Sequence, residues 1–255
     1  MIFATMLALA AIDAPLLPSG KWTVDYRSDS CVASRPFGPD AALVYLAFQP
    51  ILSPDMHKMR LSVLAPNNKG EGTGSGKAKI TLQPSGAVTT VDYDTQLIKI
   101  SGLRGYEMIV DVDRLSQIGQ STEVSIDPGN QSFSFATGKL QSVIDAAAKC
   151  NGDLMRSWGV DPAALAEPTG NPGGWFSYDQ YPAVALKKHA SGRVIIALTI
   201  NNEGRLKACR IAVTSGDPDL DRGTCDVAKS NARFVPKAGG DRYSVFTVRW
   251  WIDDQ

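Results

Sequence analysis

The chain has 255 residues, of which 44% are hydrophobic, and this length suffices for one large core or for two domains. Its 26 Lys and Arg residues balance its 26 Asp and Glu residues, so the net charge is zero. This balance gives no electrostatic reason to expect a nucleic acid or an acidic membrane surface as a partner.

The start of the chain has the composition of a secretory signal. Residues 1–11 are almost wholly apolar, and Ala8-Leu9-Ala10 has the small-x-small form of a cleavage site. No Lys or Arg precedes the apolar run, so either the true start lies upstream or the signal is weak. We expect residues 1–14 to be a signal peptide or an N-terminal apolar segment; the alternative is a buried strand or helix. Beyond residue 11, no stretch reaches the roughly 20 apolar residues that span a bilayer.

Residues 20–159 are predicted to form a mostly-β domain closed by a helix. Short runs between Gly, Pro and Asn residues predict a sandwich or a barrel-like sheet, with a small helical turn at 113–118. The predicted strands cover residues 22–26, 42–48, 59–64, 79–82, 87–93, 98–100, 107–110, 123–126 and 132–135. Spacings of three and four then predict an amphipathic helix whose apolar face is formed by Leu140, Val143, Ala147, Cys150, Leu154 and Trp158.

Residues 160–176 are rich in Pro and Gly and are predicted to be a linker. The last part, residues 177–255, is predicted to be a small α+β domain. Strands at 193–200 and 206–213 flank a tight turn at 201–204, and Asp217 is expected to cap a helix that runs to about Asn231. A final strand places Phe246, Val248, Trp250 and Ile252 on one face.

Six short motifs in this last part occur in a series that resembles the C-terminal domain of TonB. They are Gln180-Tyr181-Pro182-Ala183 with Ala185, Gly192-Arg193-Val194, Ile200 with Gly204-Arg205-Leu206, Ser215-Gly216, Leu220-Asp221, and Arg233-Phe234 with Pro236. Each motif is weak alone, but their order and spacing together are specific. The resemblance implies an α+β fold with helices on one side of a small antiparallel sheet.

The resemblance also implies a role in binding proteins. Such domains add a short extended segment of an outer-membrane receptor to the edge of their sheet, and the backbone pairing supplies the affinity. The edge is expected to be the last strand, and its partner-binding residues would be Tyr243, Val245, Thr247, Arg249 and Trp251. A TonB energy transducer needs an uncleaved membrane anchor and a long Pro-rich stalk, and neither is recognised in this sequence.

Four cysteines are consistent with disulfides in an exported protein. Cys209 lies on the inward face of a predicted strand, and Cys225 lies on the helix expected to cover that strand. A Cys209–Cys225 disulfide would contribute about 3 kcal/mol, and the remaining pair, Cys31–Cys150, about 4–5 kcal/mol. The alternative is four reduced, buried cysteines.

None of the candidate catalytic or ligand-binding motifs has all the residues that its chemistry requires. The glycine-rich stretch at 70–77 lacks a Walker glycine at Glu71 and a Ser or Thr at Ala78. Asp217-Pro218-Asp219 resembles the start of a calcium loop, but Arg222 and Ala228 replace the required Gly and Glu. Neither His57 nor His189 has a recognisable partner, so no catalytic, metal or cofactor residue is assigned.

Trp250 and Trp251 should point to opposite faces of the last strand, with Trp251 either exposed or packed on Trp175 or the first domain.

The sequence therefore predicts a non-enzymatic envelope protein of the periplasm, without a cofactor, that binds a protein segment in TonB-type transport. A TonB-dependent outer-membrane receptor is a candidate partner, nucleic acid is not, and the inner membrane is involved only if residues 1–14 are retained. Two alternatives stay open. One is a membrane-anchored energy transducer; the other is an exported enzyme or ligand-binding domain with a TonB-like docking tail.

Overall fold

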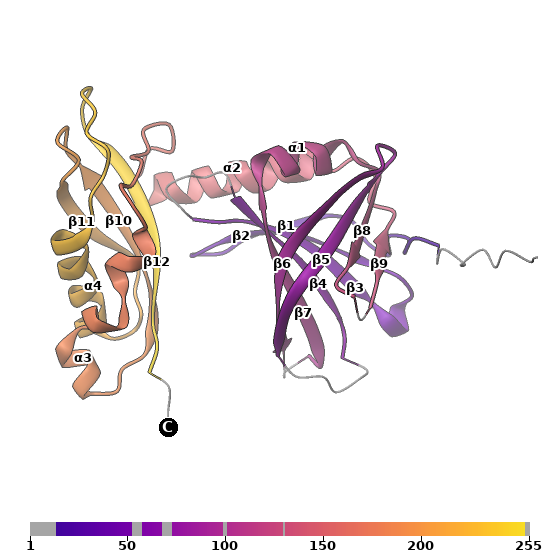
Figure 1. The fold of residues 1–255 in the computed structure, drawn as a ribbon, viewed down its shortest axis with the longest axis horizontal. Coiled ribbons are helices and arrows are strands. Elements are labelled where there is room, and N and C mark those ends of the chain that lie inside the picture. Colours follow the sequence, from indigo (N-terminus) through magenta and orange to yellow (C-terminus); the bar gives the residue numbers. More distant parts are fainter. Residues whose placement is uncertain (1–13, 53–57, 68–72, 99–100, 130, 253–255) are drawn as a thin grey trace, which may run out of the picture.

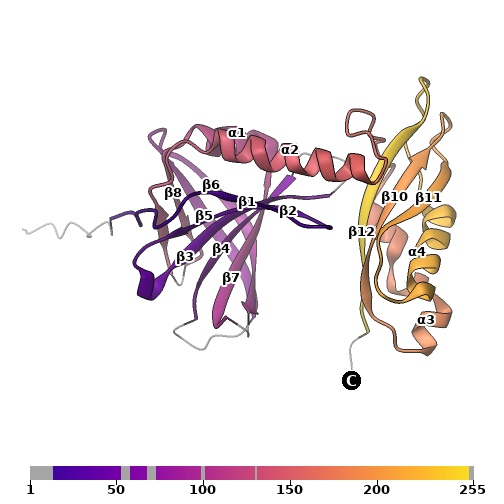
Figure 2. The same cartoon turned by 180° about the vertical axis from the view of Figure 1, so that it is seen from behind.

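The computed structural model describes residues 14–52, 58–67, 73–98, 101–129 and 131–252. The expected signal peptide and His57 therefore lie outside the described residues, apart from Ala14 at the end of the signal. The fold is α+β, as predicted, with a nine-stranded antiparallel sheet followed by a three-stranded one (Figures 1 and 2). The strands of the first sheet are β1 (Thr23–Tyr26), β2 (Cys31–Phe37), β3 (Val44–Pro50), β4 (Lys58–Pro66), β5 (Gly74–Gln83), β6 (Ala87–Ile98), β7 (Leu103–Asp111), β8 (Glu123–Asp127) and β9 (Phe133–Phe135).

The nine-stranded sheet curls into a barrel. Its strand order is β1-β2-β3-β4-β7-β6-β5-β8-β9, and residues 16–19 connect its two ends. The Leu16 amide donates to the Ser134 carbonyl at 2.7 Å, next to β9, while the Gly38 amide donates to the Leu17 carbonyl at 2.9 Å, next to β2. Closure matters physically because it occupies the backbone groups that an open sheet edge would leave unpaired.

The barrel interior is filled by alternate residues of its strands. Along β4 the buried side chains are Met59, Leu61, Val63 and Ala65, each followed by a less buried neighbour, as a strand with one face in the core requires. Aromatic rings occupy much of the space, and Phe37, Phe48, Tyr106 and Phe135 are almost completely buried. Trp22 packs on two of these rings and so connects the start of β1 with the core.

Several strands are longer than predicted, β5 and β7 among them, and two differ more strongly from the sequence prediction. Strand β2 was not predicted, because Arg35 and Pro36 interrupt its apolar pattern. It forms nevertheless, since the Pro36 carbonyl accepts from the Ser19 amide and Arg35 lies over the Phe37 ring at 5.6 Å. Residues 87–93 and 98–100 were predicted as two strands, but β6 runs without a break from Ala87 to Ile98; residues 99 and 100 lie outside the described residues. Near the end of β6, the buried Thr95 donates to the Gly74 carbonyl at 3.0 Å.

Two helices cover one end of the barrel. The shorter is α1 (Val112–Gln120), close to the helical turn expected at 113–118, and a 3-10 turn, η1 (Asp40–Ala42), lies before β3. The longer helix, α2 (Gln141–Ser157), begins on the barrel, where its buried stripe includes Val143, Ile144 and Ala147, and extends toward the three-stranded sheet (Figure 1). The amphipathic helix predicted between Leu140 and Trp158 is therefore present.

The last part of the chain is a three-stranded antiparallel sheet in the order β11-β10-β12, with helices on one face. Strand β10 alternates as predicted, and Val194, Ile196, Leu198 and Ile200 face the helices. Asp217 caps α4 by accepting from the Asp219 and Leu220 amides at 2.8 and 2.9 Å. The elements are η2 (Pro172–Phe176), η3 (Tyr178–Gln180), α3 (Ala183–Lys187), β10 (Gly192–Ile200), β11 (Leu206–Val213), α4 (Pro218–Asn231) and β12 (Arg242–Trp250).

The opposite face of this small sheet is covered as well, which the resemblance did not lead us to expect. Met155 and Trp158 at the end of α2, with Val160, pack against Ile195 and Val245. Strand β10 is therefore buried on both faces. The sequence could not show this, because the apolar stripe of α2 is continuous. The first half of the stripe faces the barrel, whereas its end faces the three-stranded sheet.

The proline-rich residues 160–176 form no long regular element, but they are packed along the sheet. Ala166 is fully buried, and bridges join Leu165 to Tyr243 and Pro168 to Phe234. Trp175, at the end of this segment, lies among the core rings of Phe234 and Phe246. These contacts stabilise the path of the segment beside β12, which bears directly on how much of that strand is accessible.

Candidate strand-binding edge

The candidate site is the outer edge of β12, the side that faces away from β10. The Tyr243 amide donates to the Ala164 carbonyl at 2.9 Å, and the Tyr243 carbonyl accepts from the Ala166 amide at 2.8 Å. Both backbone groups of Tyr243 therefore point outward. Since backbone groups in a strand alternate in direction, those of Val245, Thr247 and Arg249 point outward too.

Among the described residues, only the first of these outward positions has a backbone partner on this edge. The segment at 164–166 runs parallel to β12 at Tyr243, and continuing that pairing would require an amide at position 168 to donate to the Val245 carbonyl. Pro168 has no amide hydrogen, and the chain turns there to pair with Phe234 instead. Within the described residues, no backbone hydrogen bond joins the outer edge of β12 at Val245, Thr247 or Arg249.

The five residues predicted to bind a partner are not equally accessible through their side chains. Tyr243 is half-buried and Val245 is buried in the cluster with Met155 and Trp158, so Val245 can offer only its backbone. Thr247 and Arg249 are exposed, and Trp251 is 72% exposed. Trp250 is buried on the other face, where its Nε1 donates to the Thr224 hydroxyl at 2.8 Å.

A cleft of about 490 Å³ runs beside this edge, between the barrel and the three-stranded sheet. One wall is β12 with Thr247 and Arg249; the other comes from the barrel and includes Asp29, Arg60 and the end of β3. The barrel residues of this cleft were not predicted from the sequence. No local pattern marks them, because they meet β12 only through the tertiary fold.

An ion pair closes one side of the cleft. The Arg193 guanidinium contacts the Asp29 carboxylate, which also accepts from the Ser30 hydroxyl at 3.0 Å. Burial of Asp29 opposes its ionisation, but Arg193 and Ser30 outweigh this effect and hold the pKa of the carboxyl below its usual value. The pair is therefore fully formed at neutral pH.

We expect Asp29 to titrate below the usual aspartate pKa of about 3.9. Because the folded-state pKa is lowered, the pair contributes stability above that pH and loses it as the pH falls through the folded-state pKa. A carboxyl ¹³C NMR titration measures the midpoint directly. The variant Arg193→Gln should move the midpoint upward, and an unchanged midpoint would show that Arg193 does not stabilise the carboxylate.

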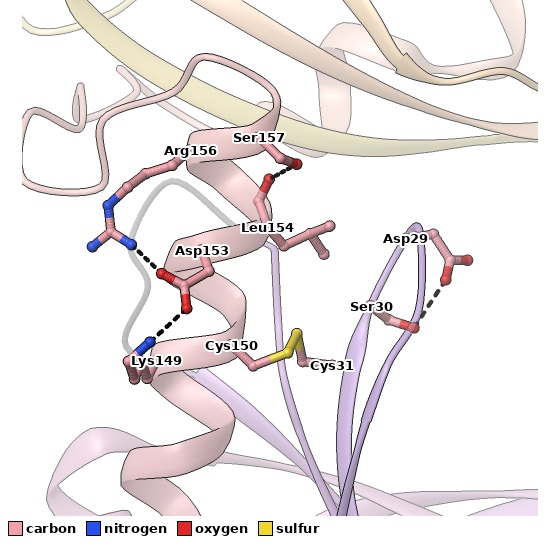
Figure 3. The surroundings of a disulfide bond; sticks show 9 residues. All are labelled: Asp29, Ser30, Cys31, Lys149, Cys150, Asp153, Leu154, Arg156 and Ser157. Carbon is pink, nitrogen blue, oxygen red and sulfur yellow. Dashed lines mark hydrogen bonds and ion pairs between the residues drawn. A yellow bond between two sulfur atoms is a disulfide. The ribbon is translucent and has the colours of Figure 1, made fainter.

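The structure holds two disulfides, and both join the cysteines that the sequence analysis paired. Cys31–Cys150 ties β2 to α2 (Figure 3), and Cys209–Cys225 ties β11 to α4. Around Cys150, Asp153 accepts from Lys149 at 2.7 Å and from Arg156 at 2.6 Å along the exposed side of the helix (Figure 3). The first disulfide thus anchors the helix that reaches the back of the three-stranded sheet.

The residues that the sequence analysis considered and rejected as motif-based sites lie as follows. Gly74 and Gly76 lie in β5, where Lys77 pairs with Asp92 at 2.7 Å rather than cradling a phosphate; residues 68–72 lie outside the description. His189 follows α3 with a φ of 54° and is exposed. Across the parts of the chain that the structure describes, no group of three or more His, Cys, Asp or Glu side chains could hold a metal ion.

The last part of the chain is thus a small α+β domain whose edge strand has unpaired backbone groups from Val245 onward among the described residues. Residues 177–250 match the family described as "Gram-negative bacterial TonB protein C-terminal". The protein therefore carries a TonB C-terminal domain. No curated protein and no solved structure matches the chain.

The family match supports a protein-interacting role. TonB-family proteins are associated with the envelope of Gram-negative bacteria, they generally interact with outer-membrane receptors, and the family is not one of enzymes. Among the described residues, no helix is long and apolar enough to cross a membrane.

Proposed function

We propose that this protein acts in the periplasm as a binding protein of TonB-type transport and captures an extended protein segment on the outer edge of β12. The observation that carries the proposal is the alternation of the β12 backbone: Tyr243 is already paired on that edge, and the same groups of Val245, Thr247 and Arg249 follow it. An added strand would satisfy these groups with its own backbone. The partner would be a segment of a TonB-dependent outer-membrane receptor.

The occupied position supports this mode of binding. The chain's own residues 164–166 make the two backbone bonds to Tyr243 that an added strand would make further along. The edge therefore accepts an extended segment without any change in β12. The unpaired backbone groups of the outer edge begin at Val245, so a partner segment would pair with the second half of β12.

The direct test adds a synthetic peptide from the N-terminal segment of such a receptor to the oxidised full chain. We expect the amide NMR signals of Val245, Thr247 and Arg249 to shift most, because their N–H groups would gain partners. The proposal is wrong if receptor peptides bind elsewhere or leave these three signals in place.

A proline at position 247 sharpens this test. Thr247→Pro removes one outward N–H and puts a ring in the path of the added strand, whereas the bonds from β12 to β10 are made by the neighbouring residues. We expect affinity for the peptide to fall at least about tenfold, as loss of a buried hydrogen bond with steric exclusion implies. The matched control, Thr247→Ala, keeps the N–H and should bind almost normally; equal losses in both variants would point to side-chain recognition instead.

A further inference from the structure

A cavity of about 500 Å³ lies on the barrel, between helix α1 and the turn that joins β5 to β6. Helix α1 is at the end of α2 that is distant from the three-stranded sheet (Figures 1 and 2), so this cavity is separate from the edge of β12. Its volume falls within the range of small-molecule sites in proteins, about 300–1,000 Å³. The residues that line it are Gln83, Pro84, Ser85, Ser116, Gln117, Gln120 and Ser121.

The chemistry of this lining differs from that of the cleft beside β12. None of the seven lining residues is charged, and six of them carry a hydroxyl or a carboxamide. The cleft beside β12, by contrast, includes Asp29, Arg60 and Arg249. A carboxamide offers two donors and an acceptor, so several of them together can hydrogen-bond with a group of neutral hydroxyls. A charged ligand would find no counter-charge among these side chains.

The two walls of the cavity are fixed relative to each other. The Thr122 amide, just after α1, donates to the Gln83 carbonyl at 2.9 Å and so joins the end of the helix to the turn. The hydroxyl of Ser121, which is 3% exposed, donates to a carbonyl in the last turn of α1 at 2.7 Å. On its other side α1 packs closely on α2, since a Cβ at Gly119 would lie 2.3 Å from Oε1 of Gln141. A preformed site of this kind loses little conformational entropy when a ligand binds.

Three carboxamides of the lining are available to a ligand. Gln83, Gln117 and Gln120 are exposed, and their side chains form no hydrogen bond with any described residue. Gln117 and Gln120 are three positions apart on α1, so they lie on one face of the helix. Gln83 comes from the opposite wall, and next to it Pro84 supplies the one apolar ring of the lining.

From this arrangement we infer that the cavity binds a neutral saccharide. Sugar rings present neighbouring hydroxyl groups that both donate and accept, which matches the hydrogen bonding of the three carboxamides. The same rings have an apolar C–H face, for which the Pro84 ring is a suitable surface. The inference concerns the barrel and goes beyond the proposed function of β12, so that neither depends on the other.

The experiment titrates the oxidised full chain with maltose and, separately, with N,N′-diacetylchitobiose, which carries acetamido groups that maltose lacks. We expect the side-chain NH₂ signals of Gln83, Gln117 and Gln120 to shift and saturate with at least one sugar, while the amide signals of β12 stay in place. Gln117→Ala and Gln120→Ala should each weaken binding about fivefold, as the loss of one hydrogen bond between neutral groups implies. Gln96→Ala removes an exposed carboxamide of β6 outside the cavity and, as the matched control, should leave binding unchanged.

The outcomes decide between a saccharide site and other uses of the cavity. Saturable shifts that depend on Gln117 and Gln120 would support the inference, and the tighter of the two sugars would show whether an acetamido group is recognised. No saturable shift with either sugar would overturn it. Equal weakening in Gln96→Ala would also overturn it, because the sugar would then bind elsewhere on the barrel. Larger shifts of the same signals with indole would show a preference for apolar ligands and overturn it as well. The peptide titration of β12 is unaffected by any of these results.

Discussion

Replacing both Cys31 and Cys150 with alanine should lower the free energy of unfolding by about 5 kcal/mol. The two cysteines are 119 positions apart, and a cross-link over so long a loop removes much of the entropy of the unfolded chain. Both residues are buried, so alanine is preferred to serine, which would leave two hydroxyl groups without partners. Urea unfolding followed by circular dichroism measures the change.

The second disulfide provides the matched control. Cys209 and Cys225 are 16 positions apart, and the same model gives about 3 kcal/mol for their cross-link. The Cys31/Cys150 variant should therefore lose more stability than the Cys209/Cys225 variant. The reverse order would show that contacts within the native state, rather than the length of the closed loop, decide how much each disulfide contributes.

The second large loss of stability is expected from a substitution at Gly204, in the turn between β10 and β11. Its φ is +74°, and a Cβ added there would lie 2.0 Å from the Phe234 carbonyl oxygen. The neighbouring backbone cannot easily move, because the Phe234 amide donates to the Gly204 carbonyl at 3.0 Å. We expect Gly204→Ala to cost about 3 kcal/mol or more, through backbone strain and this clash together.

Gly216→Ala separates the two causes. Gly216 has a φ of +91°, but an added Cβ would meet nothing within 4 Å. Gly216→Ala should therefore lose only the free energy that a non-glycine residue costs at positive φ, about 1–2 kcal/mol. Thermal or urea unfolding of both variants gives the difference, and equal losses would mean that the turn at Gly204 relaxes away from Phe234.

The sequence predicted the C-terminal domain well, because its signals are local. Alternation along β10 and β12, the glycine at 204 and the Asp217 cap each depend on residues close in the chain. One detail of β11 does not follow from simple alternation, which would place Val213 on the same face as Cys209 and Ile211. A β-bulge between Ile195 and Ile196 shifts the register there, and Val213 packs with the residues on the back of the sheet.

The candidate edge could be named from the sequence, but its accessible length could not. The strand and its alternation follow from residues 242–250 themselves. That residues 164–166 occupy the edge at Tyr243, and that Pro168 ends this pairing, follows from how a segment without regular structure packs. Pro and Gly residues indicate where regular elements stop; they do not indicate which surface the chain then follows.

By itself, the sequence determined the fold class, the TonB-like series of motifs and the pairing of Cys209 with Cys225, because each depends on periodicity or on short spacing. The tertiary structure alone decided that the barrel closes, that α2 ends on the back of the small sheet, and that a cleft lies beside β12. The Asp29–Arg193 pair joins residues 164 positions apart, and no local pattern encodes such a contact. Charge balance between distant strands appears only once the chain is folded.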